Sequence, residues 1–165
     1  MMDSAISMKK ATVGDLEELF NMQKEVFIPL YEKYEDHQTS PVIQSFERFN
    51  ERFETGNYYK IYYDGKLAGG VDVFQKSSGV MRFHIINILE QFQNKGITQE
   101  VMSRLESMYP QATSWELNTI MEEERNCYLY EKMGYVKTGD VMKINNRMTI
   151  GKFVKQENLN HYSAL

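Results

Sequence analysis

The chain has 165 residues, of which 42% are hydrophobic and 25% charged, a mix typical of one globular domain with its own core. Its net charge is −4 and it has no long run of Lys or Arg, which disfavours a nucleic-acid partner, because phosphate binding needs a clustered basic surface. The only cysteine, Cys127, excludes an intrachain disulfide and a cysteine-based metal cluster.

The chain lacks an apolar run long enough to cross a membrane, and residues 1–10 lack the apolar core of a signal peptide. The sequence therefore predicts a cytoplasmic protein with no membrane partner.

The N-terminal part is predicted to form a strand followed by a helix. Apolar and polar side chains alternate over residues 6–10, as in a strand. Residues 12–15 have the pattern of a capping box, a hydroxyl followed three positions later by an acid, and start a helix. Pro29 should end this helix near Phe27, because the residue before a proline disfavours helical geometry. Residues 30–40 are polar and are predicted to form a loop.

A second helix and three strands follow. Ser40-Pro41 places a proline in the first turn of the helix, and Gly56 ends it. Its expected buried face consists of Val42, Phe46, Phe49 and Phe53. Strands are predicted at residues 58–63, 67–74 and 80–89. The Asp64-Gly65 turn joins the first two, Gly69-Gly70 weakens the second, and the apolar third strand is expected to be central.

The remaining elements are a helix from Gly96 to Pro110, a strand at 114–119, a helix at 123–133 and a hairpin of residues 135–144 and 147–154. This order predicts a mixed α/β fold, with about seven strands and four helices, in which 80–89 and 114–119 are parallel neighbours. Residues 1–155 are interpreted as one domain and 156–165 as a C-terminal tail.

One turn has the features of an anion site. Gln93-Asn94-Lys95-Gly96-Ile97-Thr98 joins the central strand to a helix, whose first N–H groups lack intrahelical partners and whose dipole favours negative charge. A diphosphate fits such an end, Gly96 permits close approach or positive φ, and Lys95 adds charge. Taken alone, the pattern is more typical of an ordinary tight turn.

Two segments resemble motifs of the GCN5-related N-acetyltransferase (GNAT) superfamily. Residues 90–98, Glu-Gln-Phe-Gln-Asn-Lys-Gly-Ile-Thr, resemble its acetyl-CoA-binding motif, in which Gln93 and Gly96 match and Thr98 replaces a small residue. Residues 129–135, Leu-Tyr-Glu-Lys-Met-Gly-Tyr, resemble a second family segment. The order of elements is also similar, so the resemblance spans about residues 6–155.

The resemblance implies a GNAT fold and an enzyme that uses acetyl-CoA and no metal, and that acetylates a primary amine directly in a ternary complex. It places the pyrophosphate at residues 93–98, and main-chain groups of Ile88 and Leu89 against the pantetheine arm. A family asparagine that contacts CoA is replaced by Glu123, and Asn126 lies nearby.

Three residues are candidates for the chemistry. Tyr130 matches the family's general acid, a phenol that protonates the leaving thiolate. His84 matches a base position of arylalkylamine acetyltransferases and, four residues before Ile88, is expected on the same strand face. Glu116 is the competing base. Each also has a structural interpretation, as a packed tyrosine, a half-buried histidine and a solvated carboxylate. Cys127 is expected to be a packed helix residue.

The acceptor is the least defined part. Tyr31, Glu32, Tyr34, Glu35 and Asp36 offer aromatic faces and negative charge, which suits a cationic small-molecule or peptide amine, although a solvated loop explains them equally. A homodimer through the first two helices remains open. Two other classes compete with the enzyme: an acyl-CoA-binding sensor or interaction module, and a purely structural domain. Tyr130 favours the enzyme, because a sensor needs no leaving-group acid.

Overall fold

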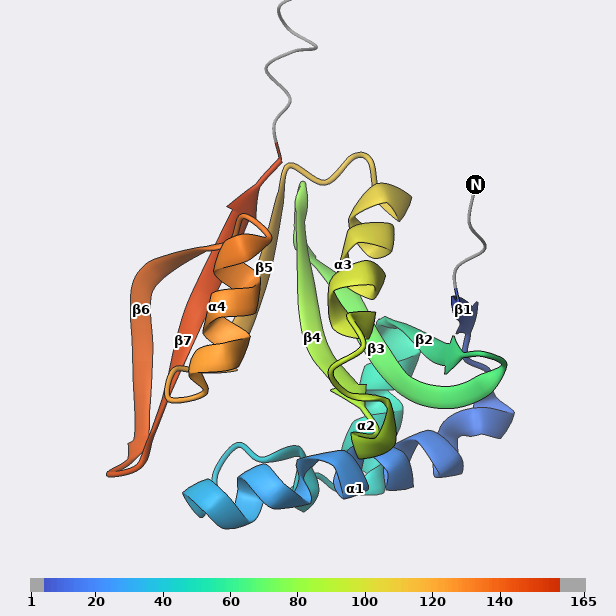
Figure 1. Ribbon diagram of the computed structural model, residues 1–165, viewed down its shortest axis with the longest axis horizontal. Coiled ribbons are helices and arrows are strands. Elements are labelled where there is room, and N and C mark those ends of the chain that lie inside the picture. Colours follow the sequence, from blue (N-terminus) through green and yellow to red (C-terminus); the bar gives the residue numbers. More distant parts are fainter. Residues whose placement is uncertain (1–4, 158–165) are drawn as a thin grey trace, which may run out of the picture.

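The computed structural model describes residues 5–157, which form a seven-stranded mixed sheet with four α-helices (Figure 1). The strands are β1 (Ile6–Lys10), β2 (Asn57–Tyr63), β3 (Lys66–Ser77), β4 (Val80–Ile88), β5 (Ser114–Ile120), β6 (Val136–Asn145) and β7 (Met148–Gln156). The helices are α1 (Leu16–Tyr34), α2 (Phe46–Thr55), α3 (Ile97–Met108) and α4 (Glu124–Lys132), with 3-10 turns at Val13–Asp15, Pro41–Ile43 and Glu90–Phe92. The predicted fold class is confirmed, with strand order β1-β2-β3-β4-β5-β7-β6.

The predicted parallel neighbours β4 and β5 pair only at one end. Their register runs Val80↔Ser114, Met81↔Trp115 and Arg82↔Glu116 and then stops. Both strands continue beyond this point, to Ile88 and Ile120, and they diverge toward the end of the sheet that α1 crosses (Figure 1). The sheet is therefore open in its middle.

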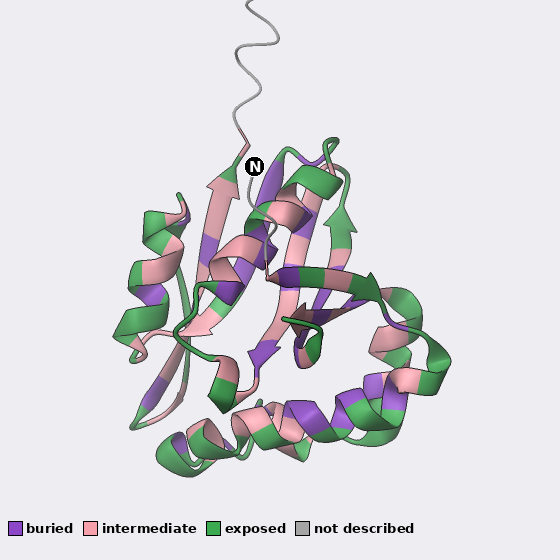
Figure 2. Ribbon diagram, turned by 45° about the vertical axis from the view of Figure 1, so that its right-hand side comes forward, coloured by how far each residue is buried: buried purple, intermediate pink, exposed green. Residues whose placement is uncertain are grey.

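Two hydrophobic clusters attach the helices to opposite faces of the sheet. Val101, Met102 and Leu105 of α3 share one cluster with Cys127 of α4 and the fully buried Trp115. The second cluster joins α1 and α2 to β2 and consists of Ala11, Leu16, Leu19, Phe20, Met22, Phe49 and Tyr58. Figure 2 shows that burial along α1 is concentrated in its first half, so the second half is free to border the opening between β4 and β5.

Helix α1 differs from the prediction. It runs through Pro29 to Tyr34, so the predicted end near Phe27 and the predicted loop over residues 30–34 are wrong. A proline inside a helix removes one backbone hydrogen bond. The end of the helix is held from outside, because Asn145 Nδ2 donates to the Tyr34 carbonyl at 2.9 Å, and Glu35 takes a left-handed φ of 52° that terminates the helix.

The second predicted helix also differs. Ser40-Pro41 starts only a 3-10 turn, and α2 begins separately at Phe46, where the Ser45 hydroxyl accepts a hydrogen bond from the Arg48 N–H. Phe49 is buried as predicted, but Phe46 is 42% exposed. The prediction of one continuous buried face is therefore wrong.

The last strand is longer than predicted. β7 runs from Met148 to Gln156, whereas the predicted strand ends at residue 154, and the Glu157 N–H donates to the Thr113 carbonyl at 2.9 Å. Residues 158–165 of the predicted tail lie outside the described residues.

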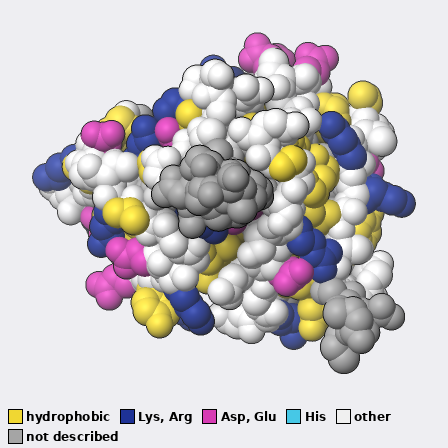
Figure 3. All heavy atoms as spheres, turned by 90° about the horizontal axis from the view of Figure 1, so that it is seen from above, with side chains coloured by type: hydrophobic (Ala, Val, Ile, Leu, Met, Phe, Trp, Pro, Cys, Tyr) yellow, Lys and Arg dark blue, Asp and Glu magenta, His cyan; other side chains and the backbone are white. Residues whose placement is uncertain are grey.

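On the face seen in Figure 3, acidic and basic side chains are interspersed. Within residues 5–157, no helix is long and apolar enough to span a membrane.

The glycine pair in β3 permits a close approach and does not interrupt the strand, which runs unbroken from Lys66 to Ser77. A Cβ on Gly69 would lie 2.1 Å from the carbonyl oxygen of Asn87 in β4. A Cβ on Gly70 would lie 2.6 Å from the hydroxyl of Tyr58. The neighbours therefore occupy the space that a side chain would take at these positions, and the pairing of β3 with β2 shifts its register between Gly69 and Leu67.

We expect Gly69→Ala to lower the free energy of unfolding by about 1–3 kcal/mol, because the new methyl group overlaps the β4 backbone. Urea denaturation measures the change. Gly14→Ala is the control, since its nearest neighbour would be Thr12 Oγ1 at 3.9 Å. Equal midpoints for the two variants would contradict the close approach of β3 and β4.

Candidate active site

A cavity of about 440 Å³ occupies the opening between β4 and β5. Residues 82–86 of β4 and 117–120 of β5 form two of its walls, and Asn126 and Tyr130 of α4 also line it. Phe27, Leu30 and Tyr31 of α1 border it on another side. The diverging strands therefore create a chamber that side chains from both halves of the sheet can reach.

The predicted anion turn lies at the end of β4. Asn94 and Gly96 both have positive φ, 64° and 76°, and no side chain caps the N-terminus of α3. A Cβ on Gly96 would meet no atom within 4 Å, so glycine is needed there for its backbone conformation. Gln93 Nε2 donates to the Ile88 carbonyl at 2.9 Å and fixes the turn to the strand.

The first residues of α3 keep this end available. Ile97 is buried in the core and anchors the helix, whereas the half-buried Thr98 has no side-chain hydrogen bond within residues 5–157. The free N–H groups of a first helical turn and the helix dipole favour an anion here.

Two cations stand beside this turn. Lys95 Nζ lies 5.6 Å from the centroid of the Tyr63 ring. Arg125, in the first turn of α4, donates from Nη2 to Asn94 Oδ1 at 2.7 Å. Arg125 was not identified from the sequence, in which it is only a basic residue near the start of the predicted helix 123–133. An uncapped helix end, positive φ and two cations together fit a diphosphate group.

The main-chain N–H and carbonyl groups of β4 point alternately toward β3 and toward the cavity. The Leu89 N–H donates to the Ala68 carbonyl of β3 at 2.8 Å, so this predicted contact is already used within the sheet. Because successive residues of a strand face opposite neighbours, Ile86 directs its N–H and carbonyl toward the opening. Ile88 directs its N–H there, while its carbonyl accepts the hydrogen bond from Gln93. Ile86 was not identified from the sequence.

His84 lines the cavity and is held by a buried carboxylate. Its Nδ1 lies 3.3 Å from Oδ2 of Asp72, whose side chain is 5% exposed, and its own side chain is 20% exposed. The register of β3 and β4 shifts between Asp72/Val73, so His84 occupies a bulge. The expectation that His84 and Ile88 share a face is wrong, because the extra residue reverses the alternation and Ile88 packs in the α3-side core with Phe83.

Tyr130 lines the same cavity from α4, whereas His84 belongs to β4. Its ring packs edge-on against Tyr135 and Phe153, at centroid distances of 6.4 and 6.1 Å. Burial raises the pKa of Tyr130 to about 12, with a smaller contribution from Cys127. The phenol therefore carries its proton at neutral pH.

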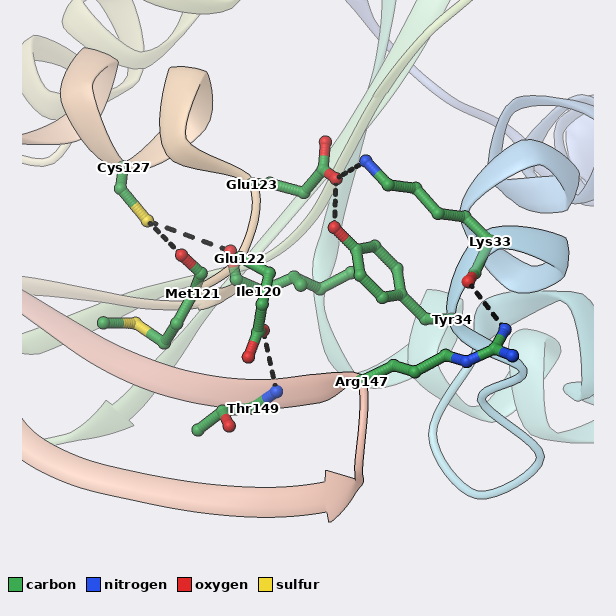
Figure 4. A network of polar contacts seen from close by, with 9 residues as sticks. All are labelled: Lys33, Tyr34, Ile120, Met121, Glu122, Glu123, Cys127, Arg147 and Thr149. Carbon is green, nitrogen blue, oxygen red and sulfur yellow. Dashed lines mark hydrogen bonds and ion pairs between the residues drawn. The ribbon is translucent and has the colours of Figure 1, made fainter.

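Cys127 lies beside the site but is turned away from it. Its Sγ points toward the carbonyls of Ile120 and Met121, at 3.8 and 3.7 Å (Figure 4). Burial raises the pKa of this thiol above its usual range, which disfavours a reactive thiolate. The position agrees with the expected packing role.

Glu116 does not line the cavity. Its Oε1 lies 2.8 Å from Lys76, 3.4 Å from Arg82 and 3.5 Å from Lys152. Burial acts to raise the pKa of Glu116, but the hydrogen bond from Lys76 and the charge of Lys152 hold it below its ordinary value. A carboxylate shared by three cations is a poor proton acceptor, so the geometry favours His84 as the base.

Glu123, which stands in the place of the family asparagine, is engaged with α1. It accepts hydrogen bonds from the Tyr34 hydroxyl and from Lys33 Nζ, the latter at 2.9 Å (Figure 4). Its side chain is therefore committed to holding the C-terminal end of α1. Asn126, one turn later, lines the cavity, as does Asn118 of β5.

The acidic and aromatic residues expected at the acceptor site are mostly used elsewhere. Glu35 pairs with Arg147 at 2.7 Å. Asp36 does line the cavity, but it is 3% exposed and its carboxylate accepts from the N–H groups of Gln38 and Thr39 and from the Thr39 hydroxyl. The carboxylates of Glu35 and Asp36, which were predicted to bind an amine cation, are therefore engaged in an ion pair and in hydrogen bonds within the protein.

Among the residues that the structure describes, no group of three or more His, Cys, Asp or Glu side chains could hold a metal ion.

A splayed pair of parallel strands, with an anion-favouring turn at the end of the first, defines an acyl-CoA-dependent acyltransferase. Residues 22–150 match the family model described as the acetyltransferase (GNAT) domain. The chain belongs to this family, is an acetyltransferase and uses acetyl-CoA as its co-substrate.

Solved structures share the fold. Spermidine N-acetyltransferase from Vibrio cholerae, in complex with CoA and spermine, is 18% identical, with a TM-score of 0.72 over 93% of this chain and 96% of that one. A GNAT family acetyltransferase from Elizabethkingia anophelis with acetyl-CoA bound is 15% identical, with a TM-score of 0.67 over 94% and 100%. PaiA N-acetyltransferase from Thermoplasma acidophilum, in complex with coenzyme A, is 15% identical, with a TM-score of 0.69 over 94% and 100%. No curated protein matches the chain.

We expect Gly96→Glu to weaken acetyl-CoA binding by at least about tenfold, which corresponds to about 1.4 kcal/mol, because it adds a negative charge beside the diphosphate. Isothermal titration calorimetry measures the affinity. Gly139→Glu is a matched control, since Gly139 also has a positive φ, of 91°, and open space around its Cβ position. Equal affinities of the two variants would mean that the diphosphate binds elsewhere.

Proposed function

We propose that this protein transfers the acetyl group of acetyl-CoA directly to a primary amine bound in the same cavity, with His84 as general base and Tyr130 as general acid. The observation that carries the proposal is that one cavity, in the opening between β4 and β5, is lined by both side chains. The acceptor is a small-molecule or peptide amine that enters beside α1.

The donor occupies the β4 side of the opening in this proposal. The turn of residues 93–98, with Lys95 and Arg125, binds the diphosphate. The pantetheine arm, which contains amides, pairs with the main-chain groups of Ile86 and the N–H of Ile88, as an added strand would. A backbone N–H aimed at the thioester oxygen also stabilises the oxyanion of the tetrahedral intermediate.

His84 accepts the proton of the amine. When Nδ1 carries hydrogen and donates to Asp72, the lone pair of Nε2 is free to act as a base, and the carboxylate then stabilises the imidazolium that forms. Asp72 is a positioning residue that the sequence did not reveal, because its contact with His84 depends on the register of β3 and β4.

Tyr130 serves the leaving group. The amine nitrogen attacks the thioester carbonyl, and collapse of the intermediate breaks the carbon–sulfur bond and leaves the electron pair on sulfur. The Tyr130 phenol gives its proton to this thiolate. A high pKa keeps the phenol protonated until the thiolate forms.

A CoA-binding sensor needs the turn and the opening but does not need a base and an acid that line one cavity. The His84–Asp72 pair and Tyr130 therefore favour the enzyme over the sensor.

The experiment that tests the proposal is thiol release from acetyl-CoA with a panel of primary amines. We expect Tyr130→Phe to lower turnover by about 10²-fold or more, the usual cost of losing a general acid, while the affinity for acetyl-CoA is retained. Tyr128→Phe is the control, since Tyr128 is 68% exposed on the same helix. Near-normal turnover would remove Tyr130 from this role, and saturable acetyl-CoA binding without thiol release for any amine would favour the sensor.

We expect Asp72→Asn to lower turnover by about tenfold, because the neutral amide no longer orients and stabilises the imidazolium. Thiol release from acetyl-CoA measures the change, and His84→Ala should lower turnover further. Equal turnover of wild-type protein, Asp72→Asn and His84→Ala would show that another group accepts the proton.

A further inference from the structure

The cavity has a cationic wall that the acetyl transfer itself does not require. We propose that the acceptor amine carries an anionic group, a carboxylate or a phosphate, which Arg52 of α2 and Arg82 of β4 bind. This inference rests on the proposed function and specifies the substrate class that it takes.

Arg52 lines the cavity as a half-buried cation without an ion pair. Within residues 5–157 no carboxylate lies within 4.0 Å of its guanidinium, and its one direct contact is with the ring of Phe74, 5.5 Å from the centroid. Asp72 and Arg48 act on it only through longer-range electrostatics. A guanidinium has five N–H donors, and withdrawing it from water without a partner is costly. An anionic ligand in the cavity would supply that partner.

Arg82 is only weakly engaged. Its side chain is 17% exposed, and its contact with Glu116 is long, at 3.4 Å. The same carboxylate oxygen also serves Lys76 and Lys152. One negative charge therefore balances three positive ones, and Arg82 retains N–H donors for a ligand in the cavity that it lines.

The acids near the cavity form no ion pair with Arg52. Asp36 uses both of its carboxylate oxygens within its own turn, and Asp72 contacts His84 through Oδ2. Arg52 and Arg82 outnumber Asp36 among the charged side chains that line the cavity, so this wall carries net positive charge although the whole chain has a net charge of −4. It would repel a polycation and attract an anion.

The positions of Arg82 and His84 also limit the distance between the amine and the anionic group of the acceptor. Arg82 and His84 are two positions apart on β4, so a bound anionic group lies close to the proposed base. A compact substrate, in which the amine and the anionic group are separated by a few bonds, can reach both. Free amino acids and short phosphorylated amines have this form.

The test measures thiol release with matched amines that differ only in the anionic group. The pairs are a set of amino acids against their α-amides, and O-phosphoethanolamine against ethanolamine, with spermidine as a polycation. We expect the anionic member of at least one pair to have a kcat/KM at least about tenfold higher. The pair that shows the difference distinguishes a carboxylate from a phosphate.

Arg52→Gln and Arg82→Gln should remove this preference by raising the KM for the anionic member more than the KM for the neutral member. Arg48→Gln, an exposed cation on the same helix, is the control and should keep the preference. Equal kcat/KM within every pair, or a preference for spermidine, would overturn the inference while leaving the acetyltransferase intact. Absence of thiol release with every amine would instead count against the proposed function.

A thermal shift titration keeps the anion site testable in that case. In the presence of CoA, the anionic amines should stabilise wild-type protein and fail to stabilise Arg52→Gln. Equal shifts in both proteins would overturn the anion site independently of turnover.

Discussion

The early end of β4–β5 pairing is the constraint on which the rest of this structure depends. Backbone groups that leave a ladder inside a sheet must find other partners, and here the strands part after Arg82↔Glu116. On one face, beside the paired end of β4 and β5, the ring centroids of Phe83 and Trp115 lie 4.7 Å apart. In addition, Glu116 connects Lys76 of β3, Arg82 of β4 and Lys152 of β7. Glu116, which was a candidate base in the sequence, therefore connects neighbouring strands by ion pairs at the point where the sheet opens.

The opening is bounded at its wide end by α1, whose position depends on contacts from distant parts of the chain. Glu123, before α4, binds Lys33 and Tyr34, and Arg147 contacts the Lys33 carbonyl (Figure 4). Asn145, in the same β6–β7 hairpin as Arg147, donates to the Tyr34 carbonyl. These contacts explain why α1 continues past Pro29. In the local sequence, Pro29 predicts a helix end. The contacts that hold the end of α1 come from residues more than 85 positions later, so the local sequence does not reveal them.

The same distinction decides what the sequence could predict about the site. Local patterns predict the turn at Gly96 and the helix that carries Tyr130. The turn lies beyond the end of β4, and Tyr130 lines the cavity. The partner of His84 could not be predicted, because a bulge between β3 and β4 brings Asp72 to it and turns His84 away from the face of Ile88. The role proposed for Arg52 could not be predicted either. It depends on the absence of an ion pair to the guanidinium within residues 5–157, and only the folded structure shows that absence.

The charges of the cavity connect substrate choice to chemistry. An amine reaches the site mostly as an ammonium ion and must lose a proton before it can attack. Cations near an ammonium disfavour its charged form, so Arg52 and Arg82 make that proton easier for His84 to remove. The same cations would expel a simple amine, and an anionic group on the substrate offsets this repulsion. In our proposal the substrate's negative charge therefore secures binding in an environment that also favours the neutral, nucleophilic amine.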